Sequence, residues 1–270
     1  MHNLILFQRL FKFSWIGFAL LAFVFPFGNS HVVSAAEKIE WSYSGKTGPA
    51  YWGKLDPAFV KCAEGTMQSP ININPSESKG SDQKDIVIRY NPTNYKVKNN
   101  THTVKIVPSN QINSLRIGDE RYGLQELHFH YPSQHQLNNK EFPLELHLVH
   151  KNAKGELAVV ALLAKEGEKN GLFQILSTYF PSAAGSENEI KETLDLSNLL
   201  PDEKEVYTYD GSLTVPPCTE GVKWIIFNKP IEMSKQQIKK ITDLYPANNR
   251  PLQPIGDREI IKQRVSVGGN

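Results

Sequence analysis

Two short stretches decide the fold of this sequence, QELHFHY at residues 125–131 and LELHLVH at residues 144–150. Side chains in a strand alternate between its two faces, so Glu126, His128 and His130 share one face of the first strand and apolar side chains share the other. In the second strand, Glu145 and His147 lie opposite three leucines in the same way. If the two strands pair, three imidazoles meet at one place.

Seven further stretches are rich in valine, isoleucine, threonine and tyrosine and are separated by asparagine, glycine and proline. This pattern is typical of short strands joined by turns, so the body is predicted to be mainly β. Ser234 and Gln237 form a capping box, which predicts a helix over residues 234–245, and a shorter helix is predicted over 172–180. Residues 37–80 are interpreted as an extended, loop-rich segment. The seven further strands are predicted at 86–90, 95–98, 102–107, 115–117, 157–165, 206–209 and 222–227.

The N-terminus has the order typical of a secretory signal peptide. Arg9 and Lys12 precede an apolar run over residues 13–27, and small residues follow up to residue 36. We therefore predict a signal peptide at 1–36 and one domain at 37–270, in a secreted or periplasmic protein that keeps no stable membrane span once the signal is cleaved. An uncleaved N-terminal anchor would have much the same flanks.

Charge excludes one class of partner. The whole chain has 30 basic and 28 acidic residues, and the loss of Arg9 and Lys12 with the signal would balance the two. A nucleic-acid-binding protein normally concentrates basic residues on one face, and no window of this sequence does so. We therefore expect no nucleic-acid partner.

The two cysteines, Cys62 and Cys218, both lie in the part of the chain predicted to be exported. An oxidising compartment allows two thiols to pair, so a disulfide is the favoured interpretation. Two buried free thiols are the alternative.

Three histidines with a fourth position open are the ligand set of a catalytic zinc, because a closed four-ligand site leaves no place for water. His128, His130 and His147 are therefore predicted metal ligands, although iron and copper remain open on ligand type alone. A ligating imidazole needs a hydrogen-bond partner for its other nitrogen, and Glu126 and Glu145 stand two positions before a histidine on the same face.

Other metalloenzymes fit the pattern less well. A cupin-like barrel also uses a His-x-His pair, but Gln134 stands where that motif needs an acid. A zinc peptidase would need a His-Glu-x-x-His helix, which this sequence lacks. His135 and His150 are interpreted as structural histidines that form hydrogen bonds behind the site.

Taken in order, QELHFHY, PSQHQ (132–136) and FPLELHLVH (142–150) resemble the α-carbonic anhydrases. The resemblance covers nearly all of residues 37–270. It implies one domain around a large, twisted, mostly antiparallel ten-stranded sheet with a few short peripheral helices, and a disulfide between Cys62 and Cys218. Further matching segments are WSY (41–43), GPAYW (48–52), QSP (68–70), NNTH (99–102), SLTVPP (212–217) and NRP (249–251).

The resemblance also implies an activity, the zinc-dependent reversible hydration of carbon dioxide to bicarbonate and a proton. By this resemblance His128, His130 and His147 bind Zn²⁺, His102 is the proton shuttle, and Thr214 orients a zinc-bound hydroxide. Sulfonamides and anions are the implied inhibitors, and a homodimer is compatible with the family. The implied substrate-binding residues are Val149, Val159, Leu213, Thr214, Val215 and Trp224, and the implied water network contains Tyr43, Asn100 and Lys105.

Three positions depart from the family. Gln134 replaces a glutamate, Glu126 replaces the usual glutamine, and Lys105 stands where the mammalian enzymes usually have asparagine. The Gln134 amide oxygen can still accept a hydrogen bond from Thr214 unless the amide is flipped. We expect Glu126 to make His128 a more basic ligand and Gln134 to loosen hydroxide orientation, which would slow the reaction at neutral pH. Because of Gln134, a carbonic-anhydrase-like zinc-binding protein with little or no turnover, acting in binding or structure, stays open as an alternative.

Overall fold

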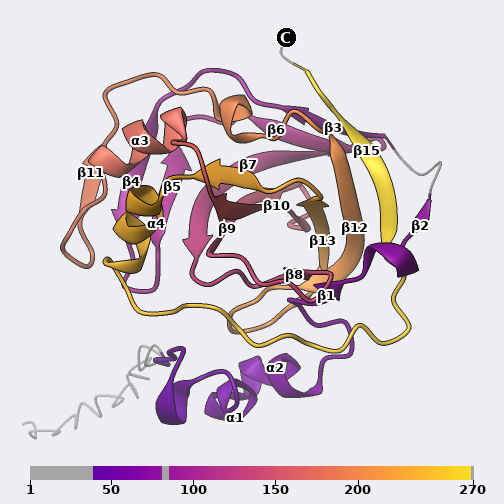
Figure 1. Cartoon of the computed structure of the whole chain (residues 1–270). Helices are drawn as coiled ribbons and strands as arrows, with labels where there is room; N and C mark the ends of the chain where they lie inside the picture. The colour runs from indigo at the N-terminus through magenta and orange to yellow at the C-terminus, as the bar shows by residue number, and fades with distance from the viewer. Residues whose placement is uncertain (1–38, 81–84, 269–270) are drawn as a thin grey trace, which may run out of the picture. The chain divides into compact units, whose positions relative to one another are not determined.

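The computed structural model describes residues 39–80 and 85–268, so the predicted signal segment lies outside the described residues. The described part contains one large sheet of thirteen strands and a small parallel sheet formed by β1 (Asn72–Ile73) and β8 (Gln136–Leu137). Figure 1 shows the large sheet curving around the centre of this part of the chain. Its strands are β2 (Lys79–Gly80), β3 (Ile86–Arg89), β4 (Tyr95–Asn99), β5 (Val104–Pro108), β6 (Ser114–Ile117), β7 (Glu120–His130), β9 (Leu144–Lys151), β10 (Leu157–Glu166), β11 (Glu187–Glu189), β12 (Glu205–Ser212), β13 (Glu220–Phe227), β14 (Ile231–Met233) and β15 (Ile261–Val267).

The sheet confirms the predicted mainly β, mostly antiparallel fold. Its order is β11-β4-β5-β7-β6-β3-β15-β12-β13-β10-β14, with β2 beside β15 and β9 between β7 and β10. Within the described residues, only four strand pairs of this sheet are parallel, namely β10–β13, β10–β14, β15–β2 and β15–β3. Three of the thirteen strands, β2, β11 and β14, have two or three residues, and the other ten are longer.

All nine predicted strands are present, with ends that differ by a few residues. The sequence analysis missed β15, which pairs with both β12 and β3 and joins two parts of the sheet. Its burial alternates along the strand, but Gln263 stands at one of the inward positions and only Val265 is buried, so the apolar alternation is weaker than in the other predicted strands. Backbone pairing with β12, β2 and β3 holds it in place.

The helices are short and peripheral, as the resemblance implied, but two of them lie in residues 37–80, where the sequence predicted an extended, loop-rich segment. They are α1 (Trp52–Leu55), α2 (Lys61–Glu64), α3 (Gly171–Thr178) and α4 (Lys235–Thr242). Ser234 and Gln237 form the predicted capping box at the start of α4, which ends three residues earlier than expected. Figure 1 shows α3 and α4 next to each other. No helix in residues 39–80 or 85–268 has the length and apolar character needed to cross a membrane.

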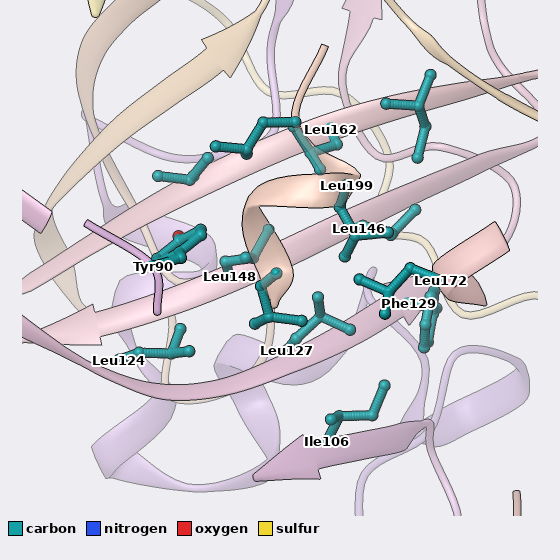
Figure 2. Close-up of a cluster of buried hydrophobic side chains, with 14 of the residues drawn as sticks. Tyr90, Ile106, Leu124, Leu127, Phe129, Leu146, Leu148, Leu162, Leu172 and Leu199 are labelled. Carbon is teal, nitrogen blue, oxygen red and sulfur yellow. The ribbon is translucent and has the colours of Figure 1, made fainter. Parts of the chain in front are cut away.

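The main core fixes the register of the two decisive strands. Leu127 and Phe129 of β7 and Leu146 and Leu148 of β9 are fully buried in one apolar cluster, which Figure 2 shows around them. Burying each such side chain contributes roughly 2 kcal/mol. A one-residue slip of either strand would turn its two side chains out of the core, so their burial also fixes which way the intervening residues point.

The cysteines form the predicted disulfide, Cys62–Cys218. No free cysteine remains among the described residues, so the alternative of two buried thiols is wrong. The bond joins α2 to the loop between β12 and β13.

Candidate metal centre

The predicted pairing of the two histidine-bearing strands is observed. β7 and β9 run antiparallel, with His128 directly opposite His147 and His130 opposite Glu145. A bulge between Leu124 and Glu126 shifts the register by one residue. Because of this extra residue, Leu124 points into the main core while Glu126, His128 and His130 point to the other face.

The three imidazoles converge. His128, His130 and His147 can each offer a ligand atom such that all three atoms lie within 4.8 Å of one another. The Nε2 atoms of His128 and His130 are 3.1 Å apart, and the rings of His130 and His147 have centroids 4.5 Å apart. Burial lowers the pKa of His147 to about 4 and the pKa of His130 well below its ordinary value. Both rings are therefore neutral at pH 7, the form that binds a metal ion.

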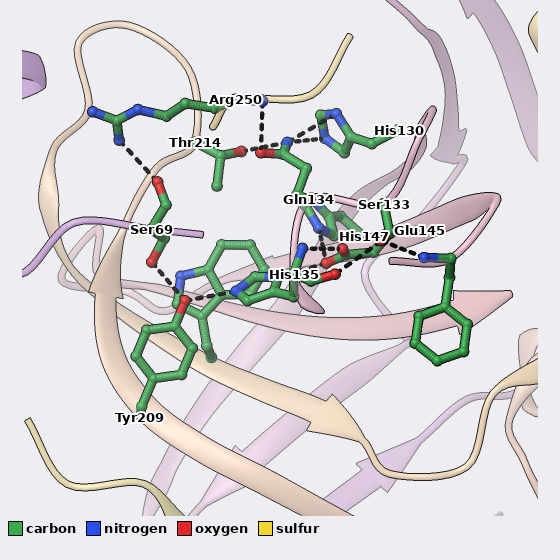
Figure 3. A network of polar contacts seen from close by, with 12 residues as sticks. Ser69, His130, Ser133, Gln134, His135, Glu145, His147, Tyr209, Thr214 and Arg250 are labelled. Atoms are coloured by element: carbon green, nitrogen blue, oxygen red, sulfur yellow. Dashed lines mark hydrogen bonds and ion pairs between the residues drawn. The ribbon is translucent and has the colours of Figure 1, made fainter. Parts of the chain in front are cut away.

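The Glu145 carboxylate forms a hydrogen bond with the His147 ring, as Figure 3 shows. Its Oε1 accepts hydrogen bonds from His147 Nε2 and His135 Nδ1, both at 2.7 Å, and its Oε2 accepts from the His135 backbone N–H. Burial alone would raise the pKa of Glu145, but His135 and His147 lower it well below its ordinary value. Since the ionised carboxylate only accepts, the proton of the neutral His147 ring lies on Nε2 and its Nδ1 lone pair is free for a metal.

The hydrogen bonds of Glu145 continue away from the triad. His135 Nε2 lies 2.6 Å from the Tyr209 hydroxyl, which is 2.7 Å from Ser69 Oγ. His135 therefore has the structural role predicted for it. His150 also lies in a hydrogen bond, to the Tyr90 hydroxyl at 3.0 Å, on the opposite face of β9 from His147.

Asn248 orients His130, and the sequence analysis did not find it. Its backbone carbonyl accepts from His130 Nδ1 at 2.8 Å, which leaves Nε2 of this ring for a metal. Its side chain accepts from the Tyr131 N–H and donates to the backbone carbonyls of His102 and Phe129. No motif marks Asn248, because it lies more than a hundred residues from His130 along the chain.

His128 faces a pair of charges that compensate each other. Lys105 Nζ lies 2.8 and 2.7 Å from the two carboxylate oxygens of Glu126. Glu126 Oε1 is 3.2 Å from His128 Nδ1, at an angle that does not make a hydrogen bond. Burial opposes ionisation of Glu126, but His128 and Lys105 lower its pKa to about 2. Two of the three departures from the family are therefore one ion pair, and Lys105 offsets part of the Glu126 charge that faces His128.

The Gln134 side chain contacts both His130 and Thr214. Its amide has the opposite orientation to the one in which the amide oxygen accepts a hydrogen bond from Thr214. Its Nε2 donates to Thr214 Oγ1 at 2.8 Å and lies 2.9 Å from both ring nitrogens of His130. Its Oε1 accepts from the backbone N–H of Arg250 at 3.4 Å. The amide is thus in the flipped orientation, since the amide nitrogen and not the oxygen faces Thr214.

An apolar surface lies beside the imidazoles. Val149, Val159 and Trp224 are register partners across β9, β10 and β13, one row from His147. Val159 and Trp224 are buried and belong to one cluster, against which Val149 and Leu213 pack. Val215 is half-buried in the loop after β12. Strand pairing and packing therefore bring four of the six predicted substrate-binding residues to one place, namely Val149, Val159, Leu213 and Trp224.

His102 lies in a turn before β5 and not inside a strand, contrary to the predicted strand 102–107. Its ring stacks on Trp41 with centroids 4.1 Å apart, and Tyr43 lies edge-on at 6.3 Å. The Asn100 side chain accepts hydrogen bonds from the backbone N–H groups of His102 and Thr103, so it shapes this turn. Trp41 is a second residue for which the sequence analysis predicted no role.

The family model described as eukaryotic-type carbonic anhydrase matches residues 47–264. The chain belongs to this family of carbonic anhydrases. Its enzyme class is therefore carbonic anhydrase. The alternative of a binding protein with little turnover is not favoured.

Bacterial carbonic anhydrases are close relatives. The carbonic anhydrase of Pectobacterium atrosepticum is 36% identical over 84% of this chain and 93% of its own length. That of Nostoc sp. is 38% identical over 84% of this chain and 87% of its own length. The solved α-carbonic anhydrase of Thermovibrio ammonificans, in complex with sulfanilamide, is 36% identical, has a TM-score of 0.80, and is matched over 83% of this chain and 99% of that one.

Proposed function

We propose that this carbonic anhydrase binds Zn²⁺ through His128 Nε2, His130 Nε2 and His147 Nδ1 and hydrates carbon dioxide reversibly to bicarbonate. The supporting observation is that three imidazoles lie within ligand distance of one another and that Asn248 and Glu145 hold the second nitrogen of two of them. Bound zinc would supply a water of pKa near 7, the value established for carbonic anhydrases, and so a nucleophile at neutral pH.

The residues around the triad have distinct roles in this proposal. Val149, Val159 and Trp224 offer an apolar surface to carbon dioxide, which has no net dipole for a polar group to hold. Thr214 would orient the reacting oxygen by a hydrogen bond. Its Oγ1 lies 2.8 Å from Gln134 Nε2, which also lies 2.9 Å from His130 Nε2, so Gln134 connects Thr214 to the triad.

His102 transfers the surplus proton to solvent in this proposal. Histidine titrates near neutral pH, and the ring of His102 is partly exposed on its stack with Trp41. Tyr43, Asn100 and Lys105 would support the water chain between His102 and the triad. Replacing His102 by alanine should slow hydration in weak buffer, and added imidazole should restore part of the rate.

The enzyme is also proposed to be exported and to bind sulfonamides and inorganic anions at the metal. The Cys62–Cys218 disulfide supports export, because such bonds persist in oxidising compartments. Cell fractionation and mass measurement of the mature N-terminus test this proposal. A full-length protein recovered from the cytoplasm would contradict it.

The decisive experiment measures zinc content and carbon dioxide hydration in the same preparations. His147→Ala should lose both zinc and activity, whereas His150→Gln should keep both, since His150 lies on the same strand but on its opposite face. Chelation should abolish wild-type hydration, and zinc should restore it. Stoichiometric zinc without hydration would support the low-turnover binding protein instead, and hydration that persists without metal would exclude the zinc mechanism.

A further inference from the structure

The orientation of the Gln134 amide agrees with the backbone group that it contacts. The Arg250 main-chain nitrogen has only a proton to offer, so the amide atom that faces it must be the oxygen. The reverse orientation would place the amide N–H₂ against a second donor, inside a site where Gln134 is only 2% exposed. An unsatisfied donor is costly in such a place. Nε2 therefore faces Thr214 Oγ1 and His130.

This orientation decides what the Thr214 hydroxyl can do. A threonine hydroxyl has one proton and two lone pairs, and Gln134 Nε2 donates into one lone pair. The Thr214 side chain has no other hydrogen bond within the described residues, so its proton remains available to a ligand at the triad. An ionised glutamate at position 134 would do the reverse, since it would accept that proton and leave Thr214 only lone pairs.

We propose that Gln134 makes Thr214 a hydrogen-bond donor toward ligands bound at the histidine triad, so that the site accepts proton-free anions that a glutamate at this position would disfavour. Proton-free anions are those, such as thiocyanate and nitrate, whose contacting atoms carry lone pairs but no hydrogen. The inference rests on the proposed function, because these anions enter the site as ligands of its zinc. Gln134 acts through Thr214 and is therefore a positioning residue that determines ligand specificity.

The test compares two monoanionic ligands on the zinc-loaded wild type and on Gln134→Glu. Thiocyanate carries no hydrogen, whereas bound sulfanilamide keeps one on its anionic nitrogen. Because both ligands bind as monoanions, the charge added by glutamate cancels in the ratio of their two dissociation constants, which calorimetry measures. In Gln134→Glu, the thiocyanate constant divided by the sulfanilamide constant should rise on the order of tenfold to a hundredfold, the value of one hydrogen bond to a charged group.

A second substitution shows whether the effect passes through the hydroxyl. Thr214→Val removes the hydroxyl with little change in shape, so in that background the ratio should be the same with glutamine or glutamate at position 134. Thr214→Ser keeps a hydroxyl and should restore the difference. Circular dichroism and zinc content show that each variant is folded and loaded.

The outcomes separate this inference from the proposed function. A wild type that binds no zinc overturns both. A zinc protein that hydrates carbon dioxide but gives the same ratio for Gln134 and Gln134→Glu overturns only the role of Gln134. A difference that survives in the Thr214→Val background also overturns it, because the effect would then be one of charge or shape.

Discussion

Removing the Cys62–Cys218 bond should destabilise the protein mainly through its unfolded state. The two cysteines are 156 residues apart, and closing a loop of that length in the unfolded chain is worth about 5 kcal/mol in the chain-entropy treatment. The folded state has other ties at the same place, since Arg250 donates to the Cys62 carbonyl at 2.9 Å and Gln68 donates to the Cys218 carbonyl at 3.1 Å. These contacts remain when the disulfide is gone, so the native fold should persist.

The assay is equilibrium urea unfolding of wild type and of Cys62→Ala/Cys218→Ala. The midpoint should fall by roughly 1.7 M urea, given a slope of about 3 kcal/mol per M for a domain of this size. Wild type treated with a reductant should match the double variant. The slope should also rise, because the unlinked unfolded chain exposes more surface. A loss of less than about 1 kcal/mol, with the native contacts intact, would refute the loop-closure reasoning.

Three further predictions concern groups near the imidazoles. Glu145→Gln should weaken zinc binding about tenfold to a hundredfold, as measured by competition with a chelator, and unchanged affinity would show that its hydrogen bond to His147 has no effect on the metal. Lys105→Met should cost about 2 kcal/mol of stability in urea, because it leaves the Glu126 carboxylate partly buried without its cation, and adding Glu126→Gln should recover most of that loss. Burial lowers the pKa of His150 to about 4, so the unfolded chain binds more protons between pH 6.5 and 4 and stability falls as the pH is lowered through that window. Between pH 6.5 and 4, metal-free His150→Gln should lose about 3 kcal/mol less unfolding free energy than metal-free wild type. Parallel curves of stability against pH would contradict the lowered pKa of His150.

Local periodicity in the sequence determined much of this protein. Alternation in residues 125–131 and 144–150 set which side chains face the core and which face the site, because burial of the leucines and Phe129 allows only one phase. The same rule predicted nine strands, and the capping box at Ser234 predicted the start of α4. The convergence of three imidazoles needed only one further condition, which was that these two strands pair.

Only the tertiary structure decided the partners of those side chains. Asn248 reaches His130 from more than a hundred residues away, and Lys105 meets Glu126 across a strand pair. The orientation of the Gln134 amide depends on a main-chain N–H at Arg250. Periodicity fixes the direction of a side chain relative to its own strand, whereas a hydrogen bond depends on distances between atoms that the chain brings together only when it folds.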